Sequence, residues 1–164
     1  MVKRHEALQP LSRDHFTELT LAQRLMKGYP ENLKSHWPKN DQKREQAKRA
    51  IEVFNLELKY HLQAEEEYLY VIAKELISPK SLKLLNKILE DHIYVKKAFK
   101  DLKHGSDEEL ANKMKKLGEK LEKHIRVEER ELFPLLERMI SEEELQKIGK
   151  RLAERETYDC SLLL

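Results

Sequence analysis

The chain has 164 residues, of which 38% are charged, 40% hydrophobic and 7% aromatic, a composition typical of exposed helices around one narrow core. Its 32 basic and 30 acidic residues nearly cancel at a net charge of +2, and the two signs are mixed along the sequence. We therefore expect no nucleic-acid partner.

The sequence also bears on the cellular compartment. Cys160 is the only cysteine, so no disulfide can form within the chain. Residues 1–10 lack the apolar core of a secretory signal. A membrane-spanning helix needs an apolar run of about 20 residues, and no run in the sequence approaches that length. We expect a soluble cytoplasmic protein without a membrane partner.

Apolar residues recur at three- and four-residue spacing in several long stretches, the pattern of amphipathic helices. Gly28 and Pro30 end the first stretch, and a loop containing Trp37 and Pro38 follows. The predicted fold is all-α: an up-down four-helix bundle with a short fifth C-terminal helix and an N-terminal extension, forming one domain over residues 1–164. The expected helices are at about 12–27, 41–77, 79–104, 107–139 and 141–156.

Serines stand at four of the predicted helix starts, where a hydroxyl can accept a hydrogen bond from a free backbone N–H. Two of them are followed three residues later by Glu, the spacing of a capping box. Pro134 falls inside the fourth helix, where it removes a hydrogen bond, so we expect a kink near Arg130. The predicted N-caps are Ser12, Ser78, Ser106 and Ser141.

Two His-x-x-x-Glu pairs interrupt the apolar stripes of the second and fourth helices. Residues four apart share one helix face, so each pair presents an imidazole and a carboxylate together. Burying a carboxylate without a partner is costly, and a metal cation is one of the few partners that can satisfy it. One histidine from each of the first and third helices completes the predicted metal-ligand set. Its members are His15, His61, Glu65, His92, His124 and Glu128.

Four histidines and two carboxylates suit a dinuclear site inside a helical bundle. Imidazoles can cap each ion while the two carboxylates bridge them. This mixed nitrogen and oxygen set favours iron, manganese or zinc over calcium or magnesium.

Four segments of the sequence resemble the hemerythrin-like family, helical bundle proteins that hold a bridged di-iron pair. The segments are LSRDHFTEL, KYHLQAEEEYL, LEDHIYVKKAF and KHIRVEERELFPLLE, and the resemblance covers most of the chain. It implies two iron ions with an oxo or hydroxo bridge, with zinc or manganese as alternatives. It also implies that His15 and His61 serve one iron, that His92 and His124 serve the other, and that Glu65 and Glu128 bridge them.

The third helix departs from the family pattern, because oxygen-carrying members present two histidines four residues apart there. Ile88 and Lys96 stand at that spacing from His92. A water, a hydroxide or a neighbouring Glu is expected in place of the fifth histidine. This departure favours sensing or redox chemistry over simple oxygen carriage.

Residues beside the ligands have a simpler interpretation. Glu66, Glu67, Glu129 and Glu131 are expected on a solvated face, although a one-residue shift can instead make Glu66 or Glu129 a metal ligand or an acceptor of a hydrogen bond from a ligand. Tyr68 is expected to pack in the core, with a hydrogen bond to a bridging carboxylate as its alternative role.

Three functions are compatible with these features. The first is a metal-binding protein whose di-iron centre senses or binds oxygen, nitric oxide, peroxide or iron, so that its partner is a small diatomic molecule or oxidant. The second is a di-iron peroxidase or oxidase. The third is a metal-free helical module that binds another protein. The sequence identifies no such protein partner.

Overall fold

The computed structural model describes residues 3–164, and these residues form helices and no strand. Segments α2 to α4 continue one another without a break, as do α6 to α7, so the chain forms five long helical segments. The α-helices are α1 (Gln9–Lys27), α2 (Lys43–Val53), α3 (Lys59–Ala64), α4 (Val71–Leu76), α5 (Pro79–Asp101), α6 (Asp107–Val127), α7 (Phe133–Met139) and α8 (Glu142–Glu154). The 3-10 helices are η1 (Glu6–Leu8) and η5 (Ser161–Leu163), and the π-helices are η2 (Phe54–Leu58), η3 (Glu65–Tyr70) and η4 (Glu128–Leu132).

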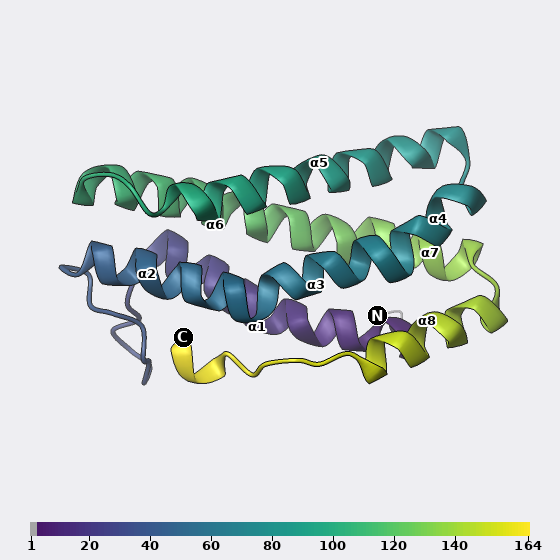
Figure 1. Cartoon of the computed structure of the whole chain (residues 1–164), viewed down its shortest axis with the longest axis horizontal. Coiled ribbons are helices and arrows are strands. Elements are labelled where there is room, and N and C mark those ends of the chain that lie inside the picture. The colour runs from purple at the N-terminus through teal and green to yellow at the C-terminus, as the bar shows by residue number, and fades with distance from the viewer. Residues whose placement is uncertain (1–2) are drawn as a thin grey trace.

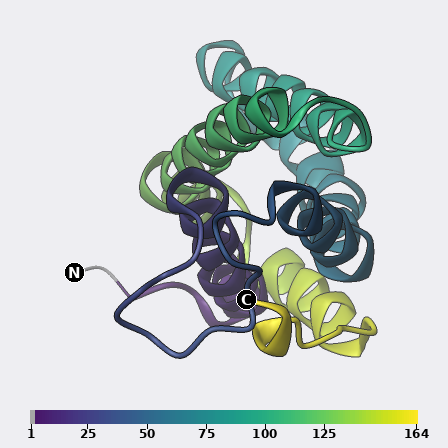
Figure 2. The same cartoon turned by 90° about the vertical axis from the view of Figure 1, so that its left-hand side faces the viewer.

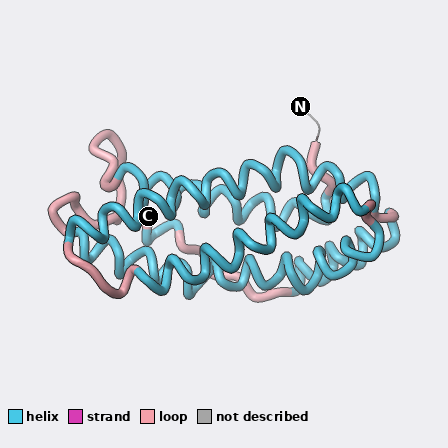
Figure 3. The backbone as a smooth tube through the Cα atoms, turned by 90° about the horizontal axis from the view of Figure 1, so that it is seen from above, coloured by secondary structure: helices cyan, strands magenta, loops and turns pink. Residues whose placement is uncertain are grey.

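The long segments lie side by side along the long axis of the molecule, and most of the loops lie at its two ends (Figures 1 and 3). Helix α1 packs along α6, which also contacts α5 and α2. Helix α8 packs on η1 and α1, and the end view places it beside the other helices (Figure 2). The all-α prediction is confirmed.

The first helix begins earlier than predicted, at Gln9, and Ser12 is not its N-cap. Pro10 lies in the first turn, where its fixed φ and missing N–H are tolerated, so the helix can start before the serine. Ser12 instead donates a hydrogen bond to Oε1 of Glu129 (2.6 Å). The other three serine caps are confirmed, and Ser106 forms a complete capping box with Glu109.

The core contains two apolar clusters, one toward each end of the bundle. One cluster includes Leu21 and Leu121, and the other includes Leu11 and Leu132. On α1 and on the α6–η4 segment, a polar layer separates the residues of the two clusters. That layer contains the predicted ligands.

Two of the π-helices begin at a predicted bridging carboxylate, η3 at Glu65 and η4 at Glu128. Single π turns inside α-helices are often found at functional sites. The second of them is centred on Arg130 and lies directly before Pro134 in α7. The irregularity expected near Arg130 is therefore a π turn, and the helix continues to Met139.

The segment after α8 is docked on the bundle. The Cys160 and Leu164 side chains belong to the first apolar cluster. Arg24 donates to the carbonyl oxygen of Leu164 (3.0 Å) and Arg49 to that of Leu163 (2.9 Å). Among residues 3–164, none of the helices has the length and apolarity needed to span a membrane.

Close packing of α1 against α6 makes Gly118→Ala a sharp test of this fold. A Cβ atom at residue 118 would lie 2.7 Å from the carbonyl oxygen of Ala22 and 2.7 Å from Cγ of Met26. We expect the substitution to lower the free energy of unfolding by about 2 kcal/mol, although Ala is the better helix former by about 1 kcal/mol. Urea unfolding in EDTA measures this loss. Lys116→Ala, at an exposed residue of the same helix, is the control and should change stability little; an unchanged Gly118→Ala would contradict the packing.

Candidate metal centre

Six buried polar side chains from four helical segments meet between the two apolar clusters. Each is 2% exposed or less. The structure therefore brings together all six predicted ligands. They are His15 from α1, His61 from α3, Glu65 from η3, His92 from α5, His124 from α6 and Glu128 from η4.

The carboxylate of Glu65 extends from one pair of histidines toward the other. Its Oε1 lies 3.1 Å from Nε2 of His61 and 3.6 Å from Nε2 of His15. Its second oxygen, Oε2, lies 3.3 Å from Nε2 of His92. Each oxygen of Glu65 thus faces a different histidine group.

Glu128 has the matching arrangement from the opposite helix. Its Oε2 lies 3.2 Å from Nε2 of His15, and its Oε1 lies 3.3 Å from Nε2 of His124 and 3.7 Å from Nε2 of His92. The imidazoles form two pairs, with ring centres 4.8 Å apart for His15 and His61 and 5.0 Å apart for His92 and His124. Both carboxylates lie between these pairs.

Many of the inward-facing atoms have no hydrogen-bond partner among the described residues. They include both oxygens of Glu65, Nε2 of His92, Nε2 of His124 and Oε2 of Glu128. Unpaired buried polar atoms are costly, and cations would satisfy these atoms. Two overlapping sets have donor atoms within 4.8 Å of one another, so the residues fit metal ions. The sets are Glu65, His92, His124 and Glu128, and His15, His61 and Glu65.

A family model described as the Hemerythrin HHE cation binding domain matches residues 6–136. The chain belongs to this family. Comparisons with curated proteins and with solved structures give no match. In this hemerythrin-type chain, the matched region contains all six convergent residues and excludes α8 and the segment that follows it.

The Nδ1 atom of each of the four histidines faces a second carboxylate. The distances from Nδ1 to the nearest carboxylate oxygen are 2.6 Å for His15, 2.9 Å for His61, 2.7 Å for His92 and 3.5 Å for His124. A carboxylate at Nδ1 favours the tautomer with its proton there, which leaves Nε2 free to bind a metal. The four carboxylates, in the same order, are Glu129, Asp14, Glu66 and Asp91.

Each of these outer carboxylates is paired in turn with a cation. Arg4 contacts Glu129 (2.9 Å), Arg155 contacts Asp14 (2.5 Å), Lys96 contacts Glu66 (2.8 Å) and Lys120 contacts Asp91 (2.5 Å). The same series of contacts, from a histidine to a carboxylate and from that carboxylate to a cation, thus occurs four times around the centre. The cations balance the outer negative charge and hold the carboxylates in place.

Lys96 therefore faces an outer carboxylate in this structure, and Ile88 lies in the second apolar cluster. The alternative role expected for Glu66 and Glu129, as hydrogen-bond acceptors beside the ligands, agrees with their contacts. Tyr68 is half-buried and packs against that cluster.

The tyrosine that reaches a carboxylate is Tyr70, which sequence reasoning missed. Its hydroxyl donates to Oε1 of Glu128 at 2.6 Å, and the residue is 1% exposed. Burial and the nearby charge of Glu128 raise the pKa of Tyr70 well above its usual value, so the phenol keeps its proton.

The carboxylates control the protonation of three of the histidines when no metal is bound. Burial alone would lower the pKa values of His15, His61 and His92, but the surrounding carboxylates outweigh it. They raise the pKa of His61 to about 10 and that of His92 to about 11. Burial would likewise raise the pKa of Glu65, but the histidines hold it well below its usual value. Protons therefore compete with metal ions for this site.

These shifts predict opposite pH trends for metal-free and metal-loaded protein. The stabilising contribution of protonated His61 and His92 is complete below pH about 6.5, the unfolded pKa, and is lost as pH rises through their folded pKa values of about 10 and about 11. Burial also raises the pKa values of Glu18 and Glu57 to about 7, so ionising them costs stability over pH about 4.5 to 7.

We expect the free energy of unfolding of metal-free protein to fall by at least about 3 kcal/mol between pH 6 and pH 9, the loss expected from one such histidine alone. Metal binding should instead tighten as pH rises from 5 to 7, because fewer protons compete. Urea unfolding in EDTA and metal titration at matched pH values measure the two trends. A metal-free protein equally stable at pH 6 and pH 9 would contradict the assignment of these charges.

Proposed function

We propose that the chain holds a dinuclear non-haem iron centre that binds or senses a small ligand such as oxygen, nitric oxide or peroxide, or responds to iron supply. We also propose that α1, α2–α4, α5 and α6–α7 form an up-down four-helix bundle around this centre, within one domain. The proposal extends the family assignment to the identity, number and use of the cations.

One observation supports two ions best: each buried carboxylate directs one oxygen at each histidine group. Glu65 approaches His61 with Oε1 and His92 with Oε2, and Glu128 approaches His15 with Oε2 and His124 with Oε1. A carboxylate so placed suits a bridge between two metals. The nitrogen and oxygen donors suit iron, with zinc and manganese as the other candidates.

Burial supports a small ligand. With all six residues at 2% exposure or less, the protein shields the centre from bulk water and from large substrates. The outer carboxylates orient the histidines, and Tyr70 fixes one oxygen of Glu128. Bound iron would supply redox chemistry at this shielded point.

Metal analysis with an absorption spectrum of freshly purified protein tests the proposal. We expect about two iron ions per chain and charge-transfer bands that disappear with dithionite and return in air. Apo protein that fails to bind added Fe(II) would overturn the proposal. Two zinc or manganese ions would retain the centre and reject iron as its metal.

A turnover enzyme, a peroxidase or oxidase, is the second candidate, and the buried Tyr70 hydroxyl on Glu128 favours it because it can hold a proton beside the centre. Steady consumption of peroxide that is lost in Tyr70→Phe, at unchanged metal content, would support this enzyme. Stoichiometric oxidation without further turnover would support binding or sensing instead.

A further inference from the structure

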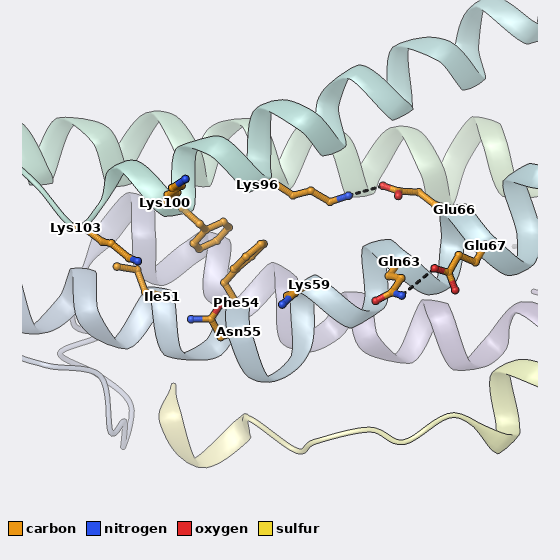
Figure 4. Close-up of a pocket in the computed structure, with 11 residues that line it drawn as sticks. Ile51, Phe54, Asn55, Lys59, Gln63, Glu66, Glu67, Lys96, Lys100 and Lys103 are labelled. Atoms are coloured by element: carbon orange, nitrogen blue, oxygen red, sulfur yellow. Dashed lines mark hydrogen bonds and ion pairs between the residues drawn. The ribbon is translucent and has the colours of Figure 1, made fainter.

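A surface groove lies next to the metal centre, between the α2–η3 segment and α5 (Figure 4). Its volume is about 490 Å³, within the range of about 300–1,000 Å³ that is usual for small-molecule pockets. None of the six convergent histidine and glutamate residues lines it. The groove is therefore a separate site.

The floor of the groove is aromatic. The rings of Phe54 and Phe99 are stacked, with centroids 4.7 Å apart and planes 18° apart. Phe99 is buried, whereas Phe54 is only half-buried, and Ile51 extends the apolar lining. This floor offers a flat apolar surface to an occupant.

The rim of the groove is cationic. Lys96 and Lys100 are four residues apart on one face of α5, Lys103 lies in the turn that follows α5, and Lys59 approaches from α3 (Figure 4). Of these, only Lys96 forms an ion pair among residues 3–164. Three ammonium groups beside one aromatic floor are left without a carboxylate.

We propose that this groove binds a small organic anion with a flat apolar body and one acidic head, such as an aromatic carboxylate. The body packs on Ile51 and on Phe54, whose ring stacks on the buried Phe99, and the head is held by the lysines of the rim. The two negative side chains of the lining, Glu66 and Glu67, are already engaged by Lys96 and Gln63. Gln63 is neutral, so Glu67 keeps its charge, but the four lysines of the lining still outnumber its two glutamates.

The groove is also linked to the proposed centre, and this part rests on the proposed function. Lys96 lines the groove and contacts Oε1 of Glu66 at 2.8 Å, and the same oxygen lies 2.7 Å from Nδ1 of His92. An anion that attracts Lys96 would weaken its hold on Glu66 and so alter His92. Binding of the anion and of metal should therefore be coupled, each changing the affinity of the other by the same factor.

Calorimetric titration of the full chain in EDTA with 2-naphthoate tests the groove without metal. We expect micromolar to sub-millimolar affinity, at least about tenfold weaker binding of the neutral 2-naphthamide, and no measurable binding of acetate. Lys100→Gln combined with Lys103→Gln should weaken naphthoate binding at least about tenfold. Lys115→Gln combined with Lys116→Gln, at exposed residues of α6, is the matched control and should change it less than about twofold.

Equal binding of 2-naphthoate and 2-naphthamide, or a groove variant that binds as tightly as the control variant, would overturn the anion site. Failure to bind 2-naphthoate would also overturn it. For the coupling, Fe(II) affinity is measured anaerobically against a chromogenic chelator, with and without saturating naphthoate. We expect a change of at least about threefold that is lost in Lys96→Gln. An Fe(II) affinity that naphthoate does not change would overturn the coupling. Absence of Fe(II) binding would overturn the proposed function. The anion site would still be tested separately by naphthoate binding in EDTA.

Discussion

Glu65→Gln is expected to cause the largest loss of metal, from about two ions per chain to well below one. The two oxygens of Glu65 face different histidine groups, and Gln keeps only one oxygen, so the substituted side chain can no longer serve both candidate ions. It also removes buried negative charge that offsets the charge of the cations. Elemental analysis after equilibration with Fe(II) and removal of excess metal measures the loss.

Glu67→Gln is the matched control, because Glu67 lies on the same π-helix but is exposed. Its metal content should equal that of the unmodified chain. Circular dichroism should show that both variants remain helical. Full metal content in Glu65→Gln would contradict its role as a bridging ligand.

Removal of metal should lower the midpoint of thermal unfolding by about 10 °C. A ligand present at 1,000 times its Kd stabilises by about 4 kcal/mol, and a chain of this size loses roughly 2–4 °C for each kcal/mol. The effect should be large here because chelation leaves the unpaired donor atoms of Glu65, His124 and Glu128 buried. Calorimetry of the iron-loaded protein, with and without excess chelator, measures the shift.

A double variant separates this effect from general destabilisation and tests the metal-free interaction module. His61→Leu combined with Glu65→Met places apolar groups at two buried positions. Its unfolding temperature should rise much less with Fe(II) than that of the unmodified chain, since one histidine and one of the two shared carboxylates are gone. A metal-free module instead predicts that the unmodified chain already shows no response to Fe(II).

The ligand positions could be predicted because residues four apart lie on the same face of an α-helix. A regular α-helix between the two members of each pair places His61 with Glu65, and His124 with Glu128, on one face. The stretches between them are α-helical. The apolar residues around them fixed which face is buried. The convergence of His15 and His92 with these pairs needed only that four helices pack side by side.

The position of Tyr70 could not be predicted in the same way, because the π-helix η3 breaks that spacing. Tyr70 lies five residues after Glu65, which on a regular α-helix is a different face. The wider π turn changes the register, so Tyr70 is buried beside Glu128, whereas Tyr68 is only half-buried. No local sequence signal distinguishes a π turn from an α turn here.

The outer carboxylates did have a signal, a repeated pattern of charged residues. Asp-His occurs at Asp14 and again at Asp91, and His-x-x-x-Glu-Glu follows each time, ending at Glu66 and at Glu129. Each aspartate contacts a histidine of the next long helical segment, Asp14 contacting His61 and Asp91 contacting His124. The glutamates instead connect the two halves of the bundle, residues 3–77 and 78–139: Glu66 contacts His92, and Glu129 contacts His15. Arg4 and Arg155 could not be anticipated, because they are far in sequence from the carboxylates that they bind.

This crossed pairing makes the metal centre an interface between two helical hairpins, residues 3–77 and 78–139. Each hairpin supplies two histidines and one of the two proposed bridging carboxylates, but the Nδ1 partner of its first histidine comes from the other hairpin. A chain cut between Ile77 and Ser78 would leave two fragments, each with one of the two histidine pairs and one of the two carboxylates. Metal ions that bind ligands from both fragments would then hold the fragments together. Association of the two fragments would therefore depend on iron and would be reversed by a chelator.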